Sequence, residues 1–452
     1  MLSRTRRILS LLLAAAMLLA GCASPASSAP QAVAQASYPE MAPYPDESSF
    51  INKLTGEFDD EGFSQVYDAW REDRSRQRSQ PEGYADSLTP FFSESIPAVL
   101  SSDTGNPVCS PLNIYLALAL LAESTGGTSQ EQILSALNAP DIASLRTQAG
   151  QVWNAHYSAD GATVSLLANS LWLDQDLTYR QDTVDLLARQ YYASVFQGDL
   201  GSSAMNEALQ TWINQQTGGL LEQQSQNLEM SPDTVLALAS TILYQAKWHT
   251  EFREENSEPS IFHAPGGDTQ VTFMKDQLTY GPYYWGTDFA AISLSIEGSG
   301  RMWLVLPDEG KTPEDVLSGG LALDMILGSP YDYPDQASIR VNLSLPKFDI
   351  TSDLRLEESL QALGITEVFD PASADFSAIL PDQPAWLDKV QHAARVMIDE
   401  EGISAAAYTA MMVAGAALPP EDEVDFILDR PFLFVITSHD NLPLFAGIVN
   451  TP

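Results

Sequence analysis

Two cysteines and five histidines are the side chains of this sequence best suited to nucleophilic or metal chemistry. Cys109 and His392 could form a thiol–imidazole pair, in which the imidazole takes the thiol proton. A buried free cysteine is usually inert packing, so we expect no catalytic residue here. We expect no metal or cofactor either, because the chain lacks CxxC, HExxH and Gly-rich phosphate-loop motifs. The remaining histidines are dispersed along the sequence: His156, His249, His263 and His439.

The most unusual segment spans residues 402–418, GISAAAYTAMMVAGAAL, which contains neither charge nor proline in a chain of net charge -38. Ile403 and Ala405 begin one set of alternate, mostly apolar positions, while Ser404 and Tyr408 belong to the other. Alternation without proline is what a central strand needs, because each central residue donates its N–H to a neighbouring strand. Alanine also has the best helix propensity, so the segment alone leaves helix and strand equally open.

The N-terminus predicts a secretory signal over residues 1–21, with three early arginines, an apolar core and a small-residue end. Its last residues and Cys22, in the order Leu-Ala-Gly-Cys, resemble a bacterial lipobox. That resemblance implies cleavage before Cys22 and a lipid on its sulfur. We therefore expect a secreted protein that is anchored at the outer face of a bacterial membrane. With only Cys109 left, a disulfide framework is excluded.

Residues 22–80 predict a lipidated cysteine, a flexible tether and one extra helix. The tether is rich in Ala, Ser, Pro and Gln and cannot bury a core. Apolar residues then recur at i, i+3, i+4 and i+7, the pattern of an amphipathic helix: Phe63, Val66, Tyr67 and Trp70. Four arginines follow, which we interpret as a solvated helix end: Arg71, Arg74, Arg76 and Arg78. A net charge of -38 argues against a nucleic-acid partner.

Residues 81–452 show no linker, repeat or low-complexity break and predict a single domain. Helical and strand patterns are mixed without regular βαβ alternation, which indicates an α+β fold. Residues 235–244 and 432–436 are apolar runs of strand length. The helix that carries Trp212 leads into Thr217-Gly218-Gly219, a Gly-assisted helix end.

Eight short motifs in this domain, in this order, resemble those of the serpin superfamily. They are Asn106-Pro107-Val108-Cys109-Ser110-Pro111, Thr217-Gly218-Gly219, Lys247-Trp248, Leu306-Pro307-Asp308-Glu309-Gly310, Leu345-Pro346-Lys347-Phe348, Ala374-Asp375-Phe376-Ser377, Asp429-Arg430-Pro431-Phe432-Leu433-Phe434 and Phe445-Ala446-Gly447-Ile448. The resemblance covers residues 85–452. It implies a large mixed or antiparallel main sheet, two smaller sheets, eight or nine helices and an exposed reactive-centre loop over about residues 400–420.

The resemblance also implies a function. A target serine protease attacks the loop as a substrate and forms a covalent acyl-enzyme, and the cleaved loop then inserts into the main sheet. Cysteine proteases form a further target class, and we expect the inhibitor to be a monomer. Counting along the loop places the scissile bond at Ala416-Ala417, whose small side chains favour shallow, elastase-like or subtilisin-like pockets. Alternative bait positions are Met412, Val413, Gly415 and Leu418.

By the same resemblance, the loop begins with a hinge that must enter the sheet. The hinge consists of Glu400, Glu401, Gly402, Ile403, Ser404, Ala405, Ala406 and Ala407. Ile403 is uncharged and β-branched, which suits a strand, whereas a charge at this position would be buried unpaired. Tyr408 departs from the small residues usual in inhibitory members.

A polar shutter beneath the sheet is implied at Ser110, Asn113, Ser240 and His392. Many serpins carry Ser at the second and Asn at the third of these positions, so two of the four differ here. One hypothesis is that His392 couples sheet opening to pH. Trp248 matches the breach, where insertion starts, and is expected to pack and gate there.

Two other functions stay open at this point. The alternative within the same fold is a non-inhibitory serpin that acts as a surface binding or carrier module. Its hinge would carry charged or bulky residues, and Tyr408 is the one position here that fits. A membrane-tethered hydrolase is the third hypothesis, although the sequence contains no GxSxG elbow.

Overall fold

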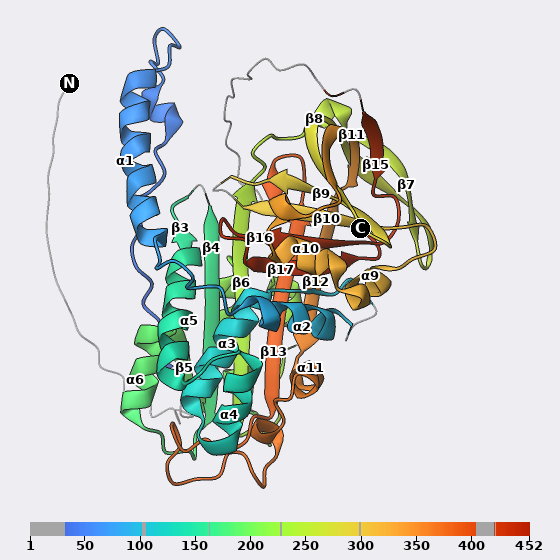
Figure 1. Cartoon of the computed structure of the whole chain (residues 1–452). Helices are drawn as coiled ribbons and strands as arrows, with labels where there is room; N and C mark the ends of the chain where they lie inside the picture. The colour runs from blue at the N-terminus through green and yellow to red at the C-terminus, as the bar shows by residue number, and fades with distance from the viewer. Residues whose placement is uncertain are drawn as a thin grey trace, which may run out of the picture.

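The computed structural model describes residues 32–101, 105–161, 163–226, 228–297, 300–403, 420 and 422–452. Two large sheets cross in this part of the chain, and most of the helices gather on one side of them (Figure 1). The main core fills the space between the sheets and these helices, and a smaller one lies on the opposite face of the main sheet. The expected α+β fold with a large mixed sheet is confirmed.

The main sheet has eight strands and a mixed pattern. Its central strand is β6 (Leu236–Lys247). This strand is buried along nearly its whole length, because most of its residues are small or apolar on both faces. The strands follow the order β1 (Ala32–Ala34), β5 (Ala193–Gly198), β4 (Val164–Asp174), β6 (Leu236–Lys247), β14 (Gly402–Ile403), β13 (Lys389–Ile398) and β12 (Phe348–Arg355), with β3 (Ser158–Ala159) paired to β4.

The second sheet has nine strands where two smaller sheets were expected. The 19-residue strand β8 (Gly267–Trp285) joins them, since most of it pairs with β7 and β11 and its last residues pair with β9. The order is β15 (Glu423–Ile427), β11 (Gln336–Pro346), β8, β9 (Phe289–Ser295), β10 (Arg301–Pro307), β16 (Phe432–Thr437), β17 (Pro443–Val449) and β2 (Val108–Cys109), with β7 (Glu258–Ala264) beside β8.

Eleven α-helices lie in the described ranges, against the eight or nine expected, because an N-terminal helix and several short ones add to the count. Helix α3 (Pro111–Ser124) is buried at every residue, as suits a helix that is apolar all round. The others are α1 (Asp60–Arg78), α2 (Thr89–Leu100), α4 (Gly127–Ala136), α5 (Ile142–His156), α6 (Gln181–Gln190), α7 (Ser203–Gln216), α8 (Glu222–Ser225), α9 (Pro313–Gly319), α10 (Leu321–Leu327) and α11 (Glu357–Ala362).

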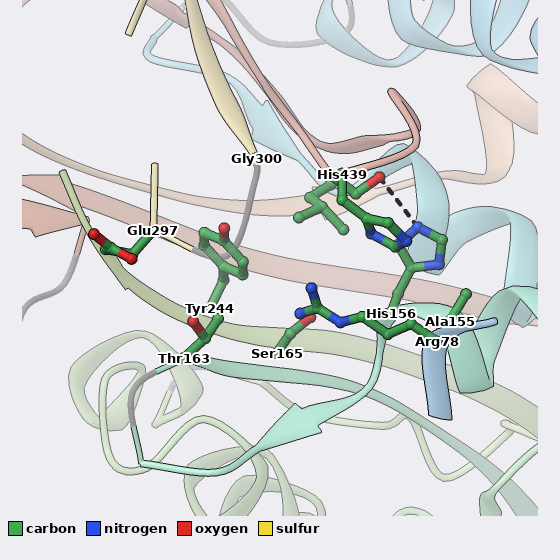
Figure 2. Close-up of a pocket in the computed structure, with 11 residues that line it drawn as sticks. Arg78, Ala155, His156, Thr163, Ser165, Tyr244, Glu297, Gly300 and His439 are labelled. Atoms are coloured by element: carbon green, nitrogen blue, oxygen red, sulfur yellow. Dashed lines mark hydrogen bonds between the residues drawn. The ribbon is translucent and has the colours of Figure 1, made fainter. Parts of the chain in front are cut away.

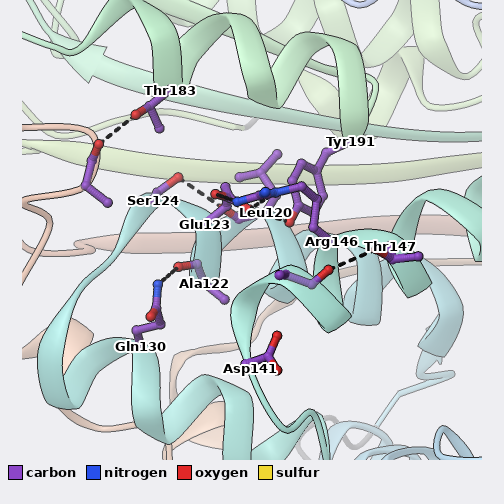
Figure 3. A network of polar contacts seen from close by, with 12 residues as sticks. Leu120, Ala122, Glu123, Ser124, Gln130, Asp141, Arg146, Thr147, Thr183 and Tyr191 are labelled. Carbon is purple, nitrogen blue, oxygen red and sulfur yellow. Dashed lines mark hydrogen bonds and ion pairs between the residues drawn. The ribbon is translucent and has the colours of Figure 1, made fainter.

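A half-buried ion pair cross-links helices that cover one face of the main sheet (Figure 3). Arg146 of α5 donates two hydrogen bonds, of 2.9 and 2.7 Å, to the carboxylate of Glu123 in α3. The Tyr191 hydroxyl, just past α6, donates to the same carboxylate at 2.9 Å. A bidentate pair with a third partner fixes both distance and orientation. The three helices therefore form one rigid backing for the sheet.

Helix α1 is the predicted extra helix, and it stands beside the body with its N-terminal end projecting beyond the sheets (Figure 1). The predicted apolar face of α1 packs on residues 44–58, and the ring centroids of Trp70 and Tyr44 are 4.9 Å apart. Val66 of the same face is 47% exposed. The predicted solvated helix end is wrong for Arg74, which is 7% exposed and paired with Asp160 at 2.5 Å. Within the described ranges, no helix combines the length and apolarity needed to cross a bilayer.

Candidate functional site

The predicted hinge meets the main sheet between β6 and β13. In the lower half these two strands pair directly and in parallel, from Lys389 opposite Ala237 to Ala393 opposite Thr241. At the upper end β14 takes over, with Gly402 opposite Lys247 and Ile403 between Ala246 and Ile398. In the lower half of the sheet β6 and β13 are thus hydrogen-bonded to each other, and at the upper end β14 lies between them. We call this arrangement the wedge. A strand inserted along the whole length would begin where β14 lies.

A tight turn carries the chain from β13 into this wedge. The carboxylate of Asp399 accepts hydrogen bonds from the backbone N–H groups of Glu401 at 3.0 Å and Gly402 at 3.2 Å. A Cβ atom on Gly402 would lie 2.4 Å from the carbonyl oxygen of Ala246. Only glycine fits so close to the neighbouring backbone. Ile403 follows with 1% of its surface exposed, as expected for a residue that faces the core.

Glu400 is a charged hinge residue that the fold buries and satisfies. Its carboxylate forms an ion pair with Lys347 and accepts a hydrogen bond of 2.6 Å from the Ser257 hydroxyl. Burial opposes ionisation, but the hydrogen bonds from Lys347 and Ser257 outweigh it and lower the pKa of the carboxyl. Its backbone carbonyl accepts from Phe252 N–H at 3.0 Å. These contacts fix the start of the loop to the strands around it.

Trp248, the predicted breach residue, contacts this turn directly. Its indole N–H donates to the carbonyl of Asp399 at 2.8 Å, and its backbone N–H donates to that of Glu401 at 3.1 Å. The side chain is 3% exposed and packs edge-on against Phe252, with ring centroids 6.0 Å apart. Trp248 therefore holds the hinge in its present position.

The four predicted shutter residues form one buried network. Nε2 of His392 accepts a hydrogen bond from the backbone N–H of Ser110 at 2.9 Å. The ring proton must then lie on Nδ1, which is 3.2 Å from the Ser240 hydroxyl. The amide of Asn113 donates to the same hydroxyl at 2.9 Å. Burial lowers the pKa of His392 to about 3, so the ring is neutral near pH 7.

Sequence reasoning missed a fifth member of this network, Asn169 of β4. Its amide N–H donates to the side-chain oxygen of Asn113 at 3.1 Å, and Asn113 also donates to the backbone carbonyl of Thr241 at 2.7 Å. The hydroxyl of Thr241 reaches the carbonyl of Ala393 on β13 at 3.2 Å. The adjacent polar residues Asn169 and Ser170, in the middle of a mostly apolar strand, are the signal that could have found it. The network lies where β6 and β13 are still paired.

The candidates for nucleophilic and metal chemistry are placed differently. Cys109 is fully buried in β2, and burial raises the pKa of its thiol, which keeps it protonated and unreactive. The dispersed histidines were a poor guide, because His156, His439 and Asp440 come together with ligand atoms within 4.8 Å of one another. Burial lowers the pKa of His439 to about 4, and His156, Arg74 and Arg78 contribute. Two neighbouring guanidinium groups make this donor set a poor fit for a metal cation.

Several predicted residues lie outside the described ranges. They are the lipidation site Cys22, the hinge residues Ser404, Ala405, Ala406 and Ala407, and the bait positions Met412, Val413, Gly415, Ala416, Ala417 and Leu418. These assignments remain predictions.

Comparison with known proteins accounts for this architecture. The family described as Serpin (serine protease inhibitor) matches residues 91–452. A serine proteinase inhibitor of Cavia porcellus is 31% identical over 376 residues, which cover 80% of this chain and 88% of that protein. Among solved structures, the thermophilic serpin tengpin in its native state gives a TM-score of 0.73 at 23% identity, covering 83% of this chain and 95% of tengpin. Thyroxine-binding globulin in complex with thyroxine gives 0.69 at 21%, covering 82% and 98%.

The family match spans most of the chain, and the curated relative passes 30% identity over most of its own length. The solved structures share the fold. The chain belongs to the serpin family, whose members are generally inhibitors of serine proteases.

Proposed function

We propose that this protein is a suicide-substrate inhibitor of extracellular serine proteases. The observation that carries the proposal is the wedge in the main sheet. The hinge already occupies the first two positions between β6 and β13, while the lower halves of these strands are still paired. A cleaved loop could continue this strand downward by replacing the five residue pairs below it.

In the proposed mechanism, the protease serine attacks the carbonyl of Ala416. The peptide bond to Ala417 breaks, the new amino terminus leaves, and an ester joins Ala416 to the protease. Insertion of about 15 loop residues at about 3.3 Å each then moves the bound protease some ~50 Å. The displacement distorts the protease before water can hydrolyse the ester. Inhibition of this kind depends on a native state that is held by a kinetic barrier.

Specificity is proposed from the loop sequence. Ala416 offers a methyl group to the primary pocket, which suits a shallow pocket and gives nothing to a deep acidic one. Elastase-like and subtilisin-like proteases are therefore the proposed targets. Met412 or Val413 as bait would shift the preference to larger apolar pockets.

We also propose that the protein acts at a bacterial cell surface. The support is the N-terminal signal with its Leu-Ala-Gly-Cys ending and the Ala/Ser/Pro/Gln-rich tether behind it. Metabolic labelling with a radioactive fatty acid tests this directly, with Cys22→Ser as the control. Label that persists in Cys22→Ser would contradict the assignment.

The test of inhibition uses residues 23–452 and a panel of elastase-like and subtilisin-like proteases. We expect a complex that survives boiling in detergent, and a released C-terminal peptide that begins at Ala417. Ile403→Arg should turn the protein into a plain substrate, because an unpaired charge cannot take up the buried position at which the inserted strand begins. Glu401→Arg introduces the same residue two positions earlier, in the turn, and should leave the complex intact. Cleavage without a complex in the unmutated protein would favour the carrier function.

A further inference from the structure

The two sheets meet at a polar seam near the upper end of β6. The seam surrounds a cavity of about 20 Å³, room for a single water molecule (Figure 2). Ser165 and Tyr244 face it from the main sheet, and Glu297 and His439 face it from turns of the second sheet. Arg78, the last residue of α1, also lines it. The N-terminal segment thus enters the boundary between the sheets.

On one side of the seam, Arg74 is tied to the main sheet. Its Nη1 lies 2.5 Å from Oδ2 of Asp160, and the two side chains are 7% and 0% exposed. Asp160 belongs to the turn between β3 and β4, and its Oδ1 accepts from the Thr163 N–H at 2.9 Å. Nε and Nη2 of Arg74 find no hydrogen-bond partner among the described residues. Asp160 is therefore the carboxylate that compensates this buried charge.

On the other side of the seam, the same segment is tied to the second sheet. The Tyr84 hydroxyl donates to Asp440, in the turn between β16 and β17. Asp440 also lies 3.0 Å from Nε2 of His156 and accepts from the Ser438 hydroxyl at 2.5 Å. Burial opposes ionisation of this carboxyl, but the neighbouring histidines and Ser438 outweigh it and hold its pKa below the usual range. The eleven residues from Arg74 to Tyr84 thus bridge the two sheets.

Loop insertion must move the two anchor points apart. A new strand between β6 and β13 separates them by about one strand spacing, roughly 4.8 Å. Asp160 moves with β4 and β6, to which its turn is joined. Asp440 stays with the second sheet, which packs on β12 through Phe348 against Phe432 and Phe434. The same sheet meets the upper end of β6, where the Glu297 N–H donates to the carbonyl of Lys247 at 2.9 Å, so opening has to overcome this contact as well. Opening therefore strains or breaks the contacts at one end of the bridge.

We propose that Arg74, Asp160, Tyr84 and Asp440 form a latch that restrains opening of the main sheet and so sets the rate of loop insertion. The proposal rests on the proposed inhibitory mechanism, because it needs a sheet that opens. Breaking the Arg74–Asp160 pair leaves a buried charge without its counterion. The free-energy cost of that separation opposes opening of the sheet. Weakening the latch should speed insertion and shorten the lifetime of the uncleaved native state.

The test measures sheet opening without any protease. A synthetic peptide with the sequence of residues 404–414 is added to the native protein, and its uptake is followed by the rise in melting temperature. Asp160→Asn and Tyr84→Phe should take up the peptide about tenfold faster, equivalent to about 1.4 kcal/mol in the barrier. Arg76→Gln is the matched control, since Arg76 lies on the same helix but is 68% exposed. It should leave the rate unchanged.

The outcomes separate this proposal from the proposed function. Faster uptake in both variants without any covalent protease complex would sustain the latch and reject inhibition. If the unmutated protein forms the covalent protease complex but both variants take up the peptide at the rate of the unmutated protein, the latch alone is rejected. If Asp160→Asn fails to fold, Tyr84→Phe decides, because it removes a single hydroxyl. No uptake by any form would overturn both proposals, since the sheet would not open.

Discussion

Two buried polar clusters join the half of the main sheet that holds β4 and β6 to the rest of the protein, and they are built from different chemistry. The shutter network of Ser110, Asn113, Asn169, Ser240 and His392 is neutral and shares its hydrogen bonds with backbone groups. The latch uses the charged pair Arg74–Asp160 and the carboxylate of Asp440. Neutral donors and acceptors can exchange partners when a strand arrives, whereas separated buried charges cannot. The shutter network therefore suits a surface along which strands move past one another, whereas the latch suits a contact that resists their separation.

Replacement of Asp160 by alanine should give the largest loss of stability. It leaves the buried Arg74 guanidinium without its counterion, and breaking such a pair costs about 3–5 kcal/mol. The double variant Arg74→Met, Asp160→Leu should recover most of this loss, because two apolar side chains leave no charge behind. The urea midpoint of unfolding, followed by tryptophan fluorescence, measures both. Equal losses in the single and double variants would contradict a charge-based latch.

Asn113→Ala should destabilise less, by about 1–3 kcal/mol, because it strips partners from neutral groups. The hydroxyl of Ser240 and the amide of Asn169 each lose one hydrogen bond. Asn154→Ala provides the control, since Asn154 bonds mainly within its own helix, to Gly150. A loss larger than that of Asp160→Ala in the same urea titration would erase the distinction between the two clusters.

The shutter should also give a pH dependence below neutrality. Burial lowers the pKa of His392 to about 3, whereas an unfolded histidine titrates near about 6.5. Between these values only the unfolded chain binds the proton. Stability therefore falls as pH drops below about 6.5, by up to about 1.4 kcal/mol per pH unit.

His392→Gln should reduce the dependence of stability on pH without abolishing it. The remaining dependence comes from His439, whose pKa is lowered to about 4. Urea midpoints at pH 7.5, 6 and 5 measure the effect. Above pH 7 the ring is neutral in both states, so His392 gives inhibition no pH dependence there. A slope unchanged by His392→Gln would show that the ring titrates normally.

The smallest effect is expected at the hinge. Trp248→Phe keeps most of the ring but loses the hydrogen bond to the carbonyl of Asp399, which contributes about 0.5–1.5 kcal/mol. The variant should lower the melting temperature slightly and raise the rate of peptide uptake. A loss as large as that of Asp160→Ala would place the main restraint at the hinge instead of at the seam.

Much of the fold could be predicted because its motifs stand in a recognisable order, and the shutter residues meet as expected. Asn169 was missed because pairing across strands is invisible in a single sequence. Arg74 was misread as solvated, although it stands four residues after Trp70 and so continues the apolar stripe of α1. Its partner Asp160 lies 86 residues away, and only the tertiary fold brings the two charges together.

Strand β1 fixes the distance between the first described residue of the chain and the hinge. Ala32 lies opposite Phe196, and across β4 this is the level of Ala237 at the lower end of β6. The hinge meets the same strand at Lys247, ten residues higher, or about 33 Å along it. The first described residue and the hinge therefore lie at opposite ends of the main sheet, and a pull on Ala32 would act on the end where β6 and β13 are still paired.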